Sequence, residues 1–188
     1  AQAQSEQVQQ LVIEALGSAD PVDGGSQGAL VVDAMTRAGA MLDAGRLRDQ
    51  AEVELGLRLT ISGVLLNNGA PAAGLHHAER AMALARGLFV GDHERLLSAH
   101  NHLARALRDS GRSADEEPVR REALAIARRL WPDGHSLLVQ TMQQYATCLL
   151  DNGRMGEGEA LLLDAATMAE RVFPGDHWVA AGLWSQLG

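Results

Sequence analysis

Apolar residues recur every three or four positions over most of this chain, and the strict apolar–polar alternation of strands is absent. This spacing predicts amphipathic α-helices. Two stripes show it best: Leu96, His100, Leu103 and Leu107 form the first, and Leu138, Met142, Tyr145 and Leu149 form the second. Further helices are predicted over residues 5–16, 29–44, 46–67, 74–89, 114–130, 155–173 and 178–187.

Several residue types return at a fixed interval of 42 positions. The series are His93/His135/His177, Gly69/Gly111/Gly153, Ala81/Ala123/Ala165 and Pro132/Pro174. A period of this length is typical of stacked supersecondary units. The sequence therefore predicts an all-α solenoid of antiparallel helix pairs, in which the three glycines adopt positive φ after the first helix of each pair.

The repeats are predicted to occupy residues 46–188, as 46–90, 91–132, 133–174 and a partial unit over 175–188. Residues 1–45 are predicted to form an N-terminal segment of two helices packed on the solenoid. Asp92 and Ser113 are the expected N-caps of the helices that follow them. The chain lacks an initiator methionine and stops within a repeat, so we expect a fragment of a longer protein.

The first repeat differs from the later ones in the polarity of one helix face. Gly56, Leu59, Gly63 and Leu66 stand 42 positions before polar residues of the second repeat. We expect the helix over 29–44 or 5–16 to cover this apolar face, because exposed apolar surface is costly.

The repeated residues resemble the tetratricopeptide repeat in its longer variant, found in kinesin light chains. The resemblance covers about residues 47–188 and rests on segments 91–93, 101–104, 107–112, 116–118 and 121–126. It implies a right-handed superhelical solenoid whose first helices line a concave, peptide-binding groove. The chain departs from the shared pattern at Glu116 and Arg120, where a small and a bulky apolar residue are usual. These two residues are four apart and could form an ion pair.

A narrower resemblance concerns the front half of the chain. Segments 16–21, 49–53 and 57–60 look like the region after the kinase domain in some bacterial serine/threonine kinases with tetratricopeptide tails, and segment 176–180 is similar to a late repeat of such tails. No kinase motif lies in the chain. This resemblance implies a regulatory region. The sequence leaves its compartment open, with the cytoplasm favoured and the periplasmic part of a membrane-anchored kinase as the alternative.

Charge and composition restrict the classes of partner. The formal net charge of −8 argues against non-specific nucleic-acid binding. No apolar run approaches the ~18 residues that a membrane span needs. A C-terminal helix without its partner predicts self-association through the bare end of the solenoid.

The candidate chemistry does not favour an enzyme. Equivalent histidines of successive repeats would lie roughly 16–20 Å apart, so one metal ion with bonds of ~2 Å cannot gather them. Cys148 is expected to be a buried, inert thiol. Phosphate-binding loops, nucleophile elbows and paired-carboxylate signatures are absent. We therefore predict no catalytic residue, no cofactor and no metal.

A polar stripe on the first helices is the candidate binding site. Its predicted members are Ser98, Asn101, Arg105, Arg108, Gln140, Gln143, Thr147 and Asp151. Side-chain amides can bond to a peptide main chain, and arginine suits carboxylates. The sequence thus predicts a protein or peptide partner with an acidic group. Two alternatives stay open: a small-molecule sensor or enzyme with a pocket near residues 17–45, and a structural spacer.

Overall fold

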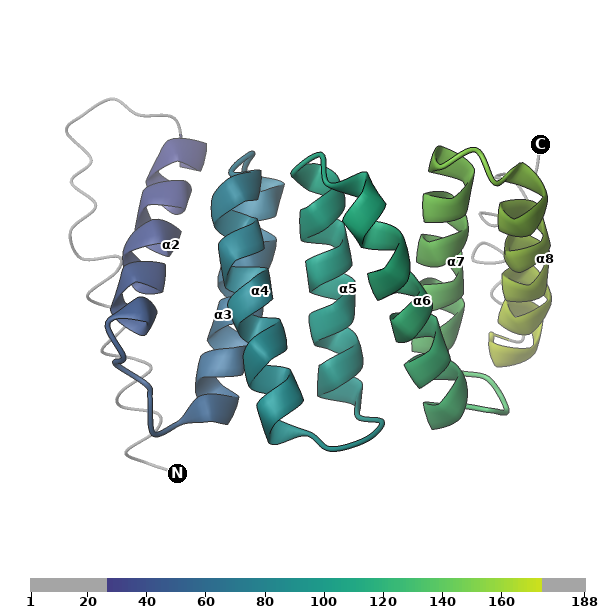
Figure 1. Ribbon diagram of the computed structural model, residues 1–188, viewed down its shortest axis with the longest axis horizontal. Helices are drawn as coiled ribbons and strands as arrows, with labels where there is room; N and C mark the ends of the chain where they lie inside the picture. The colour runs from purple at the N-terminus through teal and green to yellow at the C-terminus, as the bar shows by residue number, and fades with distance from the viewer. Residues whose placement is uncertain (1–26, 174–188) are drawn as a thin grey trace. The chain divides into compact units, whose positions relative to one another are not determined.

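The computed structural model describes residues 27–173, and helices are the only regular elements in that range. They are α2 (Gln27–Asp43), α3 (Ala51–Asn67), α4 (Pro71–Leu88), α5 (Glu94–Asp109), α6 (Ser113–Leu130), α7 (Ser136–Asp151) and α8 (Met155–Val172) (Figure 1). The all-α prediction is confirmed. The helices predicted over 5–16 and 178–187, and the expected packing of the latter, lie outside the described residues.

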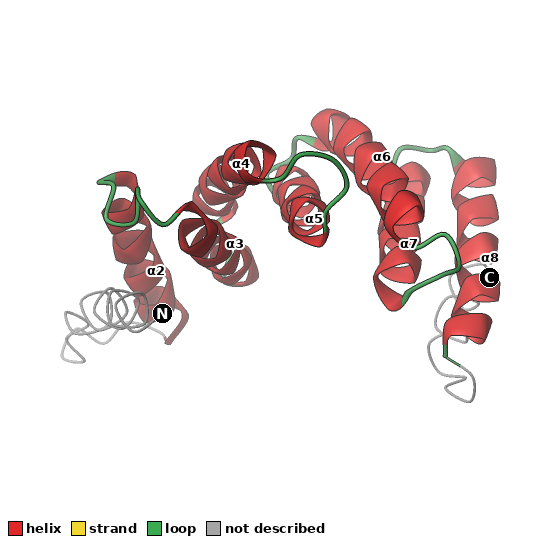
Figure 2. Ribbon diagram, turned by 90° about the horizontal axis from the view of Figure 1, so that it is seen from below, coloured by secondary structure: helices red, strands yellow, loops and turns green. Residues whose placement is uncertain are grey.

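The helices gather into two compact units that divide between Leu88 and Phe89. In the first unit, α3 packs along α4 and α2 packs against α3. In the second, α5 packs on α6, α6 on α7 and α7 on α8, and Figure 2 shows α5 and α7 on the same side of α6. The sequence-based division at residue 45 stays a prediction.

Glycine turns join the two helices of each pair. Gly69, Gly111 and Gly153 have φ of 76°, 75° and 77°, as predicted. After α5, the Gly111 N–H donates to the Arg108 carbonyl (2.9 Å) and the next N–H donates to the Leu107 carbonyl (2.8 Å). This is the Schellman arrangement, which satisfies carbonyls at a helix end and needs a left-handed residue.

Histidines, rather than the expected aspartate, cap the first helices of the second unit. Nδ1 of His93 accepts from the Arg95 N–H at 3.1 Å, and Nδ1 of His135 accepts from the Leu137 N–H at 3.2 Å. The two rings stack on Phe89 and Trp131, with ring centroids 3.9 and 4.4 Å apart. The periodic histidines described here therefore fix helix starts.

The predictions for Asp92 and Ser113 as caps are wrong. Asp92 receives two hydrogen bonds of 2.7 Å from Arg129 at the end of α6, so its carboxylate is already engaged. Arg112 is the N-cap residue of α6, and Ser113 is the first residue inside the helix.

The first repeat also differs from prediction in where its helix starts. Residues 46–49 form turns instead of helix, because Gly45 (φ 84°) ends the preceding helix, and Gln50 is the N-cap residue of α3. The Gln50 N–H bonds to the Leu47 carbonyl at 2.8 Å. The chain enters α4 at Pro71, a favoured first helical residue.

Helix α2 packs against α3, but not on the expected residues. Ala38 and Leu42 form a buried cluster with Leu47, Ile61 and Leu65. Leu66 is instead buried in the neighbourhood of Gly74 of α4, and Leu59 is half-buried. The apolar face of α3 that α2 covers is thus rotated from the predicted one.

Candidate functional site

A groove of ≈ 700 Å³ lies in the second unit, between α5 and α7 with α6 beneath them. Its lining residues are Glu94, Arg95, Leu97, Ser98, Asn101, His102, Arg105, Arg108, Arg120, Leu137, Gln140 and Gln144. Of the eight predicted site residues, the lining includes Ser98, Asn101, Arg105, Arg108 and Gln140, and it leaves out Gln143, Thr147 and Asp151.

The missing residues have other places on α7. Gln143 and Thr147 are half-buried, and the Thr147 hydroxyl donates to the Gln143 carbonyl at 3.1 Å. Asp151 is exposed at the last position of the helix. Gln144, one position further along the chain than the predicted Gln143, contributes to the lining instead.

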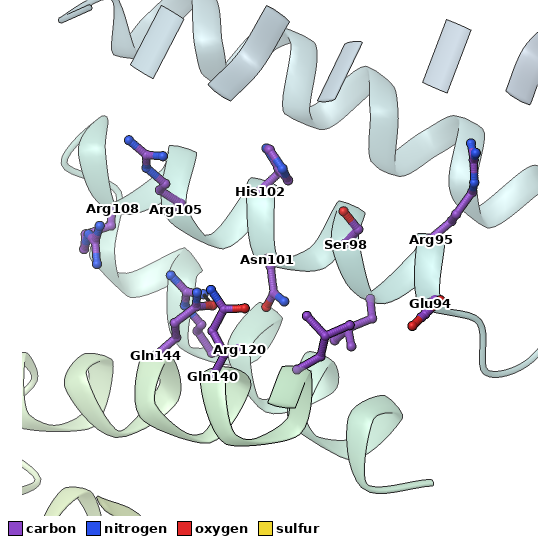
Figure 3. Close-up of a pocket in the computed structure, with 12 residues that line it drawn as sticks. Glu94, Arg95, Ser98, Asn101, His102, Arg105, Arg108, Arg120, Gln140 and Gln144 are labelled. Atoms are coloured by element: carbon purple, nitrogen blue, oxygen red, sulfur yellow. Dashed lines mark hydrogen bonds between the residues drawn. The ribbon is translucent and has the colours of Figure 1, made fainter. Parts of the chain in front are cut away.

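The lining residues of α5 leave the helix in two directions. In Figure 3, Asn101 points toward α7, whereas Ser98, His102 and Arg105 leave the other side of α5. The turn of about 100° per residue explains this spread over the helix surface. The predicted stripe is therefore divided between the space facing α7 and a second, adjoining face.

Arg120 supplies a buried positive charge at the floor of the groove. Its side chain is 2% exposed. Nε donates to Glu116 at 3.0 Å, and Nη1 donates to Oε1 of Gln144 at 2.7 Å. The predicted Glu116–Arg120 ion pair is thus confirmed within α6, and the separate bond from Arg120 to Gln144 connects α6 to α7. Burial lowers the pKa of Arg120, opposed by the bond to Glu116, and a guanidinium stays protonated in proteins.

Glu116 of the second repeat stands where the two flanking repeats have a glycine in close contact with a leucine. Gly74 and Gly158 occupy the position equivalent to Glu116, at intervals of 42. A Cβ on Gly74 would lie 2.8 Å from Cγ of Leu66, and one on Gly158 would lie 2.7 Å from Cγ of Leu150. Glycine in those pairs therefore makes room for leucine.

In the second repeat the leucine is replaced as well. Arg108 occupies the position of Leu66 and Leu150, and Arg120 occupies that of Ala78 and Leu162. Three charged residues thus stand where the flanking repeats pack apolar and small side chains. Sequence reasoning missed Arg120 as a groove residue, although comparing its two equivalents at 42-residue spacing would have singled it out.

Arg105 and Arg108 share one carboxylate. Nε of each lies 3.3 Å from an oxygen of Asp109, and the two side chains are 38% and 41% exposed. These long contacts at a wet surface contribute little to stability. An incoming carboxylate can therefore compete with Asp109 for Arg108 on the side of α5 that faces α7.

Two more polar groups distinguish the groove. Oδ1 of Asn101 is buried without a hydrogen-bond partner, which is unusual because buried polar atoms are nearly always paired. Burial lowers the pKa of His102, and the nearby Arg105 adds to this effect. The ring of His102 is therefore mainly neutral at pH 7.

The other features considered for chemistry are a cysteine, possible metal ligands and possible membrane spans. Cys148 is buried, and burial raises the pKa of its thiol to about 11, so the reactive thiolate is scarce. Within residues 27–173, no cluster of His, Cys, Asp and Glu has the makings of a metal site. Over the same range, every helix is too short or too polar to cross a membrane.

Comparison with known proteins identifies the fold. No family profile and no curated protein matches the sequence. Two crystal structures of a putative kinesin light chain from Podosopora anserina, with nearly identical TPR-like repeats, are similar to this chain. Their TM-scores are 0.57 and 0.56 at 16% identity; each alignment covers 90% of this chain, and 86% and 87% of theirs. The chain thus has a TPR-like helical repeat fold.

Proposed function

We propose that the chain is a protein-interaction module whose groove between α5 and α7 binds a partner segment carrying at least one acidic group. The observation that carries this proposal is the approach of Arg108 and the buried Arg120 to one groove whose walls also present side-chain amides. Helical repeats commonly use concave surfaces of this kind to bind other proteins.

The charge of the groove supports an acidic partner. Four arginines and one glutamate line it, in a chain of net charge −8. Two of these arginines, Arg108 and Arg120, lie on the side of α5 that faces α7. Arginine presents a planar fork that matches carboxylates, including a terminal carboxylate. Asn101, Gln140 and Gln144 supply donors and acceptors for the partner's main chain.

The test compares binding by wild type and by the double variant Asn101→Ala/Arg108→Gln. The variant should weaken partner binding by ~2 kcal/mol or more and leave the helical circular-dichroism signal unchanged. Arg128→Gln is the matched control, because Arg128 is exposed on α6 and does not line the groove. Wild-type affinity should also fall as salt rises. Identical partner sets and affinities for wild type and double variant would contradict the proposal.

The sequence resemblance supports a biological context for this module. Segments 49–53 and 57–60 look like the regulatory region of bacterial serine/threonine kinases, so we place the groove in such a tail. The test is the gene of origin: a kinase domain encoded upstream in the same reading frame supports this context, and an unrelated upstream domain contradicts it.

A further inference from the structure

The groove has leucine side chains at one end, side-chain amides in the middle and a positive charge at the other end. Leu97 and Leu137 line it near the N-terminal ends of α5 and α7. Leu137 keeps 37% of its surface exposed, so it offers an apolar contact to a ligand. Asn101, Gln140 and Gln144 occupy the middle, and Arg108 lies at the far end. Figure 3 shows the amides and Arg120 together, with Arg108 beyond them.

The spacing of these parts sets the length of the partner segment. Leu97 and Arg108 are eleven residues apart on α5, which is about 16 Å at 1.5 Å per residue. Arg120 is bonded to Gln144 in the middle of the groove, so a carboxylate held between Arg108 and Arg120 lies closer to the apolar end. The two anchors are therefore less than about 16 Å apart. Four residues of extended chain span about 13 Å, whereas five already span about 16 Å.

The amide-rich middle favours an extended ligand. A helix satisfies its own main-chain groups, whereas an extended segment needs partners for them. Side chains of an extended segment alternate between its two faces. Two anchors that both face the floor of the groove must therefore be an even number of residues apart.

We propose that the groove recognises an extended segment with an apolar side chain and an acidic side chain four residues apart. The apolar anchor packs on the exposed side chain of Leu137, at the end of the groove where the buried Leu97 also contributes to the lining. The acidic anchor binds Arg108 and Arg120. The main chain between them bonds to Asn101, Gln140 and Gln144. This inference rests on the proposed function and adds the composition and spacing of the partner.

The experiment uses the full chain and a set of capped, fluorescein-labelled peptides. Each peptide carries one leucine and one glutamate at separations of two to six residues, in both orders, within a serine and glycine background. Fluorescence anisotropy should show about tenfold tighter binding at a separation of four than at three or five, in one of the two orders. A tenfold difference corresponds to about 1.4 kcal/mol, close to the value of one partly buried apolar side chain.

Variants assign the two anchors. Leu137→Ser should weaken binding of the best peptide about tenfold and leave unchanged the affinity of the same peptide with serine in place of leucine. Arg108→Gln should abolish the preference for glutamate over glutamine while the preference for leucine persists. Arg128→Gln should behave as wild type.

The outcomes separate this inference from the function on which it rests. If glutamate peptides bind more tightly than glutamine peptides and Arg108→Gln removes that difference, but separation and leucine have no effect, the spacing inference is overturned and the acidic groove stands. If glutamate and glutamine peptides bind alike to wild type at every separation, the acidic-partner proposal itself is overturned.

Discussion

At the residue scale, a substitution at Gly111 measures the cost of backbone strain without any change in packing. Its φ is 75°, and a Cβ there would meet nothing within 4 Å. Gly111→Ala should therefore lower the free energy of unfolding by ~1–2 kcal/mol through the left-handed conformation alone. Gly56→Ala is the matched control, because Gly56 lies inside α3 with equal space and no positive φ. It should raise stability by ~0.5–1 kcal/mol. Equal shifts of the urea midpoint for the two variants would contradict this view of the turn.

His77 should make stability depend on pH. Burial, then the charges of His76 and Arg58, lowers the pKa of His77 from 6.5 to about 4. Nη1 of Arg58 lies 3.2 Å from His77 Nδ1, so this nitrogen accepts and the ring is neutral. The unfolded chain binds the proton first as pH falls, so stability is complete above pH 6.5 and is lost toward pH 4.

The loss should amount to roughly 3 kcal/mol between those two pH values. Urea titrations of wild type and His77→Asn at several pH values measure it. The variant is expected to show a flatter dependence on pH over this window, whatever its stability at pH 7. Parallel pH profiles for the two proteins would show that folding does not lower the pKa of His77.

At the element scale, the Glu116–Arg120 pair decides how α6 packs. Both side chains are almost fully buried, and removing one partner leaves the other charge uncompensated. Arg120→Leu should cost roughly 3 kcal/mol. The double variant Glu116→Ala/Arg120→Leu imitates the apolar pattern of the flanking repeats and should cost much less. Thermal or urea unfolding checks this, and an additive loss in the double variant would show that the two charges are not coupled.

The helical pairs and their turns could be predicted from sequence because their causes are local. The glycines at 42-residue spacing mark positions where only a left-handed residue ends the helix, and all three have positive φ. The caps could not be predicted as well. Aspartate is a preferred N-cap residue. The carboxylate of Asp92 is instead hydrogen-bonded to Arg129, which is 37 residues away in the sequence.

The candidate site was predicted in part for a related reason. Periodicity placed Asn101, Arg108 and Gln140 on the groove, because first helices present one face to it. It also suggested Gln143, whereas the helix turns Gln144 toward Arg120. The orientation of α7 about its axis depends on packing with α6 and α8, which one helix's sequence does not specify.

At the scale of the whole molecule, the charges are unevenly shared. The chain carries a net charge of −8, yet arginines dominate the groove of the second unit. Under the proposed function, such a local reversal of charge would steer an acidic partner to one face and repel it elsewhere. The repeats around this groove keep glycine, alanine and leucine at the equivalent positions, so the fold does not require the charges.

Site-specific photocrosslinking tests the central claim most directly. A photoreactive amino acid replaces Gln140, which is exposed in the groove, or Leu163, which is 48% exposed on α8. Mass spectrometry then maps the linked segment of the partner. We expect crosslinks from position 140 to a partner segment that contains an aspartate, a glutamate or a free C-terminus. These crosslinks should disappear when Arg108→Gln is added, and position 163 should give none. Crosslinks to a partner from position 163 and none from position 140 would contradict it.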